Sequence, residues 1–189
     1  GQGLGFDDVV DSYVDAGDPG NGVLDFGTSV DFSISLWFAN CAGSCTLINK
    51  GNNASGQSGY VISITNNEGF RASIRNGSND GFCLVNGPLS LAPNKSWRHV
   101  AVVFLRKASC TTSDILIYVN GTRENGTVVD TSSSNTNANI NNSEKFLIGA
   151  SVTSGNPPLT SNDPSIDDVR VYNRVLSADE IKRLYNSGR

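Results

Sequence analysis

Runs of alternating apolar and polar residues recur along most of this chain. The clearest covers residues 31–38 (DFSISLWF), in which apolar residues hold every second position and Trp37 is the one aromatic residue on the opposite face. Because neighbouring side chains of a β-strand point to opposite faces, this run predicts a strand with one face in a core. Shorter runs predict strands at 3–8, 12–15, 46–48, 60–65, 70–75, 81–85, 114–119, 128–129 and 146–149. Their spacing of about eight to twelve residues, with turns rich in Asn and Gly, is typical of antiparallel sheets.

The segment 97–105 differs from these runs because it is apolar on both faces. Trp97 and His99 share one face with Ala101 and Val103, and three further apolar residues fall on the other. The segment therefore predicts a central strand that is covered on both sides. Long surface loops are expected at 130–143 and 151–164.

The last stretch, residues 166–185, predicts a strand followed by a short helix. Alternation places Asp167 on the same face as Val169 and Val171, which we expect to be the core side. Ser177 as N-cap, with Glu180 three residues later, forms a capping box, and a helix that ends at Gly188 follows. We expect this helix to plug one end of an otherwise all-β body.

Composition narrows the possible partners. Only 17% of the residues are charged, while 22 are Asn, and the net charge is −4 with a pI near 4.9. Nucleic-acid binding needs a basic stripe, and the sequence has no cluster of Lys and Arg. Insertion into a membrane is excluded as well, because no apolar run approaches the roughly 20 residues that a spanning helix requires.

Four cysteines and six N-x-[S/T] sequons favour an oxidising compartment. The spacing of the cysteines fits neither a zinc knuckle nor a CxxC redox motif, and three pairings are possible. We favour Cys41–Cys45 and Cys83–Cys110 over four free buried thiols. The sequons begin at Asn53, Asn76, Asn94, Asn120, Asn125 and Asn141. The sequence starts at Gly1 without Met, so we expect a secreted or cell-surface protein whose targeting segment has been removed.

The order of motifs resembles a known family. FSISLWF, Gly59-Tyr60, WRHVAVVF, LIYVNG, FLIG and IDDVRVYNRVLSADEIKRLY follow one another in this order over nearly the whole chain. This order is similar to that of laminin-G-like, concanavalin A-like jelly rolls. The resemblance implies a single domain, residues 1–189, that is all-β: a two-sheet antiparallel jelly-roll sandwich with six or seven strands per sheet and one short C-terminal helix.

The resemblance also implies a structural calcium ion near the chain ends. Its carboxylate ligands would be Asp7 (or Asp8) and Asp167, which opens the last strand. A carboxylate on the core side needs a cation or several hydrogen-bond donors, so the expectation has a physical basis. The alternative is that backbone amides at the end of the sheet satisfy Asp167.

The sequence offers no clear catalytic set. Glycosidases need two nearby carboxylates, and Glu68, Glu124 and Glu144 each lack a second acid two residues away. Asp7-Asp8 and Asp167-Asp168 are adjacent, which in a regular strand sends the two side chains to opposite faces. His99, the only histidine, is expected to be a packed residue. We therefore predict a non-catalytic protein.

Three functions stay open at this stage. The first is an extracellular module for glycan binding or cell-surface adhesion, with contacts from Trp37, Arg75, Asn76 and Asp80. In this hypothesis Trp37 is a stacking platform for sugars on an open sheet face, although it could equally be covered by a loop. The second is a glycosylated subunit of an extracellular fibre or coat, which would self-assemble with neighbouring copies. The third is a polysaccharide-degrading hydrolase.

Overall fold

A computed structural model of the chain describes residues 3–6, 12–41, 43–51, 58–65, 69–76, 82–87, 96–124, 126–130, 137, 139–152, 159–160 and 164–188. Within these residues the elements are β1 (Leu4–Gly5), β2 (Val14–Asp15), β3 (Phe32–Ala39), β4 (Cys45–Gly51), β5 (Ser58–Thr65), β6 (Gly69–Asn76), β7 (Phe82–Asn86), β8 (Arg98–Phe104), β9 (Ile115–Val119), β10 (Thr122–Glu124), β11 (Thr127–Asp130), β12 (Phe146–Ile148), β13 (Ala150–Ser151), β14 (Leu159–Thr160), β15 (Ser165–Tyr172) and α1 (Ala178–Ser187). The predicted all-β body with a single short C-terminal helix is confirmed.

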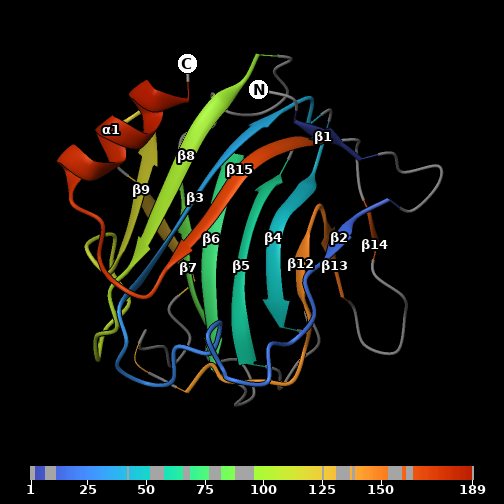
Figure 1. Cartoon of the computed structure of the whole chain (residues 1–189). Helices are drawn as coiled ribbons and strands as arrows, with labels where there is room; N and C mark the ends of the chain where they lie inside the picture. Colours follow the sequence, from blue (N-terminus) through green and yellow to red (C-terminus); the bar gives the residue numbers. More distant parts are fainter. Residues whose placement is uncertain are drawn as a thin grey trace.

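Two antiparallel sheets form the sandwich (Figure 1). In the described part of the chain, a six-stranded sheet has the order β1-β15-β3-β8-β9-β10 and a seven-stranded sheet the order β11-β7-β6-β5-β4-β12-β2. Strands β13 and β14 form a separate small pair, with β13 at the start of the expected loop 151–164 and β14 inside it. The strands expected at 3–8 and 12–15 shorten to β1 and β2, which belong to different sheets because β1 pairs with β15 and β2 with β12.

The core lies between the two sheets. The core-facing side chains of β3 are at most 2% exposed, as the alternation predicts; they are Phe32, Ile34, Leu36 and Phe38. The ring of Phe32 stacks on Phe26 and Phe104, with centroid distances of 4.1 and 4.5 Å. Burial of these large rings supplies much of the hydrophobic stabilisation of the sandwich.

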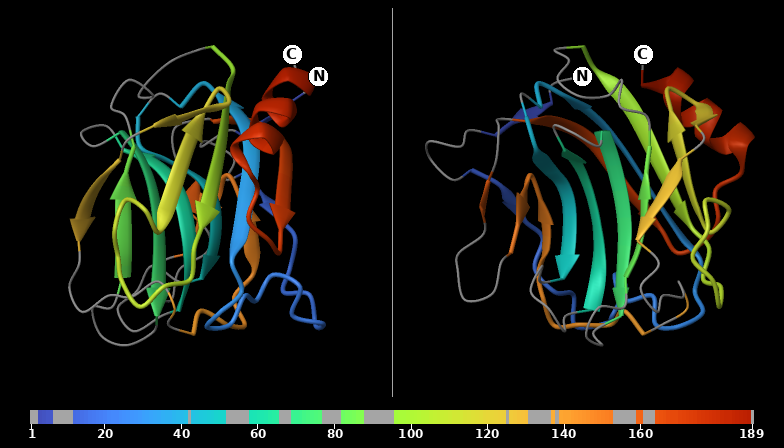
Figure 2. Two further views of the ribbon diagram at one scale, coloured as in Figure 1. Left: turned by 90° about the vertical axis from the view of Figure 1, so that its left-hand side faces the viewer. Right: turned by 180° about the vertical axis from the view of Figure 1, so that it is seen from behind.

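Helix α1 covers the outer face of the six-stranded sheet, so the expectation that it plugs one end is wrong (Figure 2). Leu176 and Ile181 pack against Ala101, Val103 and Tyr118 in a second buried cluster. This cluster explains why the segment 97–105 is apolar on both faces: one side meets the core and the other meets the helix. The sequence predicted that both faces of this strand are covered, but it did not predict that α1 covers the outer face.

Local signals fix the start of α1. Ser177 Oγ accepts from the backbone N–H of Glu180, and Glu180 Oε2 accepts from the N–H of Ser177 at 2.8 Å, which confirms the capping box. Ser33 anchors the approach to the helix, because its hydroxyl accepts from Leu176 N and donates to the carbonyl of Arg174. The outer face of β3 is thus polar in composition and still buried.

A β-bulge in β15 changes which side chains share a face. The register shifts between Asp167 and Arg170, and Asp168 has a φ of 50°. Asp167 pairs with Trp37 and therefore faces outward, whereas Val171 pairs with Ile34 and faces the core. The expectation that Asp167 points to the core side is wrong, because simple alternation does not survive the extra residue of a bulge.

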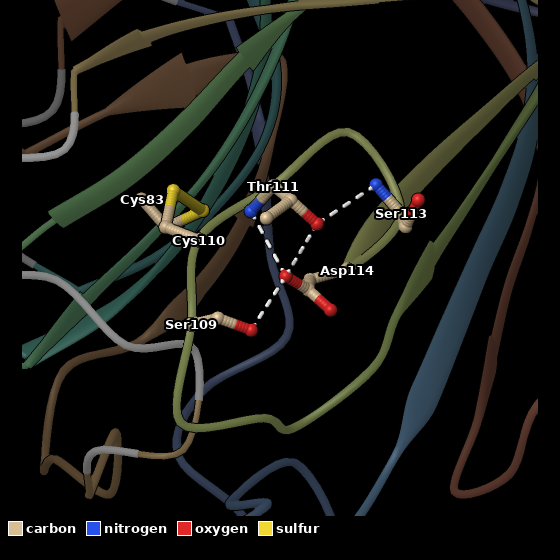
Figure 3. Close-up of a disulfide and its surroundings, with 6 residues drawn as sticks. All are labelled: Cys83, Ser109, Cys110, Thr111, Ser113 and Asp114. Atoms are coloured by element: carbon tan, nitrogen blue, oxygen red, sulfur yellow. Dashed lines mark hydrogen bonds between the residues drawn. A yellow bond between two sulfur atoms is a disulfide. The ribbon is translucent and has the colours of Figure 1, made fainter.

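Both favoured disulfides are present. Cys41 pairs with Cys45, and Cys83 on β7 pairs with Cys110 in the loop between β8 and β9, which ties one sheet to the other. Asp114 organises the loop beside Cys110 (Figure 3). Its Oδ2 accepts from the hydroxyl of Ser109 and from both the N–H and the hydroxyl of Thr111, at 2.7–3.0 Å.

Lys50, near the end of β4, ties together the segments around Asp18 and around residues 142–144. Its side chain is fully buried, and Nζ donates to Asp18 Oδ1 at 3.0 Å and to the carbonyls of Asn142 and Glu144 at 3.2 and 2.9 Å. Asp25 Oδ1 lies 3.4 Å away, an ion pair by distance that is not aligned for a hydrogen bond. A buried charge is tolerated because these partners replace water.

Candidate functional site

A groove of about 710 Å³ lies beside the C-terminal end of α1, on the outer side of the six-stranded sheet. Its walls come from β3, the residue just before β8, the β9–β10 turn, β15 and the end of α1. The lining residues are Trp37, Trp97, Asn120, Asp167, Asp168, Tyr185, Ser187 and Gly188. Its volume falls in the range of pockets that take small molecules.

Trp37 forms the inner wall of the groove. It is only 9% exposed, and the ring of Tyr185 stacks on it with the centroids 5.7 Å apart. A side chain at position 188 would collide with the indole, so Gly188 lets the end of α1 lie directly on Trp37. Trp37 is therefore not an open platform, and it is covered by the helix rather than by a loop.

Trp97 is the accessible aromatic residue of the groove. It is 43% exposed, against 9% for Trp37, so it is the indole of this groove that a ligand can reach. Gly3 directly precedes β1, the edge strand of the six-stranded sheet, and lies against the indole of Trp97. Any side chain at position 3 would collide with the ring. The indole is thus held in place on one side while part of it faces solvent.

Polar groups converge on the same groove. Asp167 Oδ1 accepts from the N–H of Asp168 at 2.8 Å, and Asp168 Oδ1 accepts from Arg170 Nε at 2.7 Å. Asn120 occupies the first position of the two-residue β9–β10 turn, and its Oδ1 accepts from the N–H of His99 at 3.0 Å. Carboxylates and amides beside a half-exposed indole can bind a ligand that has both an apolar face and several hydroxyl or amine groups.

The bulge brings Asp167 and Asp168 to one groove. The expectation that these neighbours point to opposite faces holds for a regular strand and fails here, because the positive φ of Asp168 turns its side chain back toward the groove. Asp168 and Arg170 form an ion pair, and the hydrogen bond to Asp168 is the main reason why the pKa of Arg170 is raised.

His99 lies behind the groove wall. It is 1% exposed, its Nε2 lies 2.9 Å from Ser35 Oγ, and its ring meets Trp37 edge-on at 5.4 Å. Burial lowers the pKa of His99 to about 4, although nearby Asp168 opposes the shift. The prediction that His99 is a packed residue is confirmed, and at neutral pH it adds no positive charge to the site.

Comparison with known proteins identifies the family of the chain. A profile of the concanavalin A-like lectin/glucanases superfamily matches residues 8–182. The chain belongs to this superfamily. No curated protein sequence matches this concanavalin A-like domain.

Several solved structures share the fold of this concanavalin A-like domain. The binding domain of Paraclostridial Mosquitocidal Protein 1 superposes with a TM-score of 0.65 at 16% identity, over 94% of this chain and 41% of that one. The binding domain of botulinum neurotoxin DC, in complex with rat synaptotagmin II, gives 0.64 at 19% identity, over 98% and 42%. Botulinum neurotoxin type C, which depends on two ganglioside molecules to enter cells, gives 0.59 at 18% identity, over 86% and 37%.

An enzyme is also among the matches. The sialidase of Trypanosoma rangeli gives a TM-score of 0.53 at 19% identity, over 84% of this chain and 23% of that one. The concanavalin A-like domain spans less than half the length of each of these proteins. At such identities the likeness establishes the fold alone.

The groove differs from the contact set that the sequence suggested. Arg75 and Asn76 lie on β6 of the seven-stranded sheet, whereas Trp37 lies on the six-stranded sheet, so they do not form one surface with it. Asp80 lies outside the described residues. Of the sequons, Asn120 lines the groove and Asn141 is exposed, while Asn53, Asn94 and Asn125 lie outside the described residues. Whether any sequon carries a glycan stays a prediction.

The calcium site also stays a prediction. Asp7 and Asp8 lie outside the described residues, and within the described part of the chain no group of three or more His, Cys, Asp or Glu residues could hold a metal ion. Asp167 alone does not make a calcium site, because the ion takes six to eight oxygen ligands. Nor does any helix among the described residues have the length and apolar character to cross a membrane.

Of the eight residues that line the groove, the sequence pointed only to Trp37 as a ligand contact. The other seven were not predicted in this role: Trp97, Asn120, Asp167, Asp168, Tyr185, Ser187 and Gly188. The sequence contained one indication for Trp97. It lies two residues before His99, on the face of the strand that the helix covers, and it stands at the edge of the covered region. No sequence signal places Tyr185 and Ser187 beside Trp37, because the docking position of α1 depends on the tertiary structure.

Proposed function

We propose that this concanavalin A-like domain is an extracellular, non-catalytic module that binds glycans in the groove at the end of α1. The observation that carries the proposal is the half-exposed indole of Trp97 beside two carboxylates and an amide. A flat aromatic ring packs against the apolar face of a sugar, and the polar groups bind its hydroxyls. The neighbours that contact a ganglioside or a receptor protein support a binding role in this fold.

Two disulfides support the extracellular location, because such bonds persist in oxidising compartments. The proposal is tested on a glycan array with the wild-type protein and Trp97→Ala. A central tryptophan contact contributes about 2 kcal/mol or more, so the variant should bind about thirtyfold more weakly. Val23→Ala is the matched control, because Val23 is also an exposed apolar residue and does not line the groove. Equal binding by all three proteins would refute this site.

One observation favours a second function, a glycoside hydrolase, because Asp167 and Asp168 both line the groove. A glycosidase needs one of its two carboxyls protonated to serve as the acid. Asp168 forms an ion pair with Arg170 at 2.7 Å, which suits the carboxylate of such a pair and would leave the role of the acid to Asp167. Release of reducing sugar from mixed polysaccharides, abolished in Asp167→Asn or Asp168→Asn, would overturn the non-catalytic proposal.

A further inference from the structure

The charged residues that line the groove are of one sign. Asp167 and Asp168 are its only ionisable lining residues apart from Tyr185, and no Lys, Arg or His belongs to the described lining. Arg170 neutralises part of the charge of Asp168. Asp167 has no cationic partner within the described part of the chain, and only one of its oxygens accepts a hydrogen bond there.

The end of α1 adds to this negative potential. The helix ends at Ser187, and Ser187 and Gly188 border the groove. The last carbonyls of a helix carry a partial negative charge, and the last turn of α1 contains no basic residue to balance it. Buried His99 stays neutral at pH 7 because its pKa lies near 4.

The aromatic residues of the groove also favour a cationic ligand. Trp37, Trp97 and Tyr185 line the same groove as the carboxylates, and the faces of aromatic rings attract cations, with tryptophan the strongest of the three types. A ligand carboxylate would instead meet two carboxylates and a helix C-terminus, and both of these disfavour a negative charge.

We infer that the groove selects saccharides that carry a protonated amine, such as glucosamine oligomers, and disfavours carboxylated sugars such as sialic acid. The inference rests on the proposed glycan-binding function and adds the chemical class of the ligand. The amine would lie near Asp167, and the apolar face of the sugar ring would lie on Trp97. The sialyl ligands bound in two solved structures of this fold, one of a botulinum neurotoxin DC binding domain and one of the sialidase, would therefore be poor ligands here.

Isothermal titration calorimetry of the whole chain tests this inference at a pH where the amine is protonated. The probes are a glucosamine trisaccharide, its neutral N-acetylated counterpart and sialyllactose, with a lysine tripeptide as a fourth arm. We expect the glucosamine trisaccharide to bind about tenfold more tightly than the N-acetylated form, because one charge-assisted hydrogen bond contributes about 1.5 kcal/mol. Asp167→Asn should remove this tenfold preference, so that the glucosamine trisaccharide and its N-acetylated counterpart bind the variant with similar affinity.

Asp15→Asn is the matched control. It removes the same charge from an exposed residue on β2 in the other sheet, and it should leave the preference intact. Circular dichroism and thermal unfolding confirm that each variant folds. Equal or tighter binding of sialyllactose or of the neutral sugar would overturn the charge selectivity while leaving glycan binding in place. Comparable binding of the lysine peptide would overturn the saccharide assignment, and no binding of any sugar would overturn the proposed function itself.

Discussion

Replacement of Ile181 by alanine tests whether α1 is a wall of the binding site. Ile181 is fully buried between the helix and the outer face of β8 and β9. The change removes three carbon atoms, which corresponds to about 2.4 kcal/mol of transfer free energy at about 0.8 kcal/mol each, and the cavity left behind adds to this. We expect the attachment of α1 to weaken by about 3 kcal/mol.

Hydrogen exchange followed by mass spectrometry measures this effect locally. Amide exchange should accelerate most at residues 178–187, because the helix opens more readily than the sheets. Lys182→Ala is the control, since Lys182 is the exposed neighbour of Ile181 and its replacement should change stability by less than about 0.5 kcal/mol.

The same variant should lose affinity for saccharides, because Tyr185, Ser187 and Gly188 line the groove only while the helix is docked. If exchange at 178–187 matches the Lys182→Ala control, the packing of α1 is not as described. If exchange accelerates and affinity stays at the wild-type value, the helix is not part of the binding site.

Three further predictions concern stability. The pKa of His99 falls from 6.5 to about 4 on folding, so between these pH values the unfolded chain binds a proton more readily than the folded one. The free energy of unfolding should therefore fall by about 2 to 3 kcal/mol as the pH drops from 6.5 to 4. His99→Gln should remove this component, and identical pH profiles for wild type and variant would contradict the assignment. Lys50→Met should cost about 2 to 3 kcal/mol in a urea titration, because it leaves Asp18 and Asp25 without their buried cation; an unchanged midpoint would show that the network is dispensable. Loss of the Cys83–Cys110 disulfide, which spans 27 residues, should lower the free energy of unfolding by about 3.5 kcal/mol, and loss of Cys41–Cys45, which spans 4, by about 2 kcal/mol. Thermal unfolding of the two double Cys→Ser variants measures both losses, and the reverse order would contradict the loop-entropy reasoning.

Elements controlled by local chemistry could be predicted from the sequence. Alternation gave most strands of the sandwich to within two or three residues, and the Ser177–Glu180 capping box gave the start of α1. Asn-Gly is the dipeptide that favours a two-residue hairpin turn, and Asn120-Gly121 forms the tight β9–β10 turn, in which both residues have positive φ. In each case the pattern within about ten residues contains the physical cause.

The groove could not be predicted in the same way, for two reasons. The bulge at Asp168 depends on a positive φ in a residue other than glycine, and alternation alone places Asp167 on the wrong face. The docking of Tyr185 and Gly188 on Trp37 joins residues about 150 positions apart, and no local pattern specifies this contact. The fold was therefore predictable, whereas the site was not.

The central claim is that saccharides bind against Trp97, and nuclear magnetic resonance of the two indole N–H groups tests it most directly. The chain contains only Trp37 and Trp97, so two resonances cover every indole and Trp97→Ala assigns them. On titration with the glucosamine trisaccharide, we expect the Trp97 resonance to shift with a saturable profile and the variant to lose binding. Saturable binding with both resonances unmoved, or full affinity in Trp97→Ala, would contradict the account.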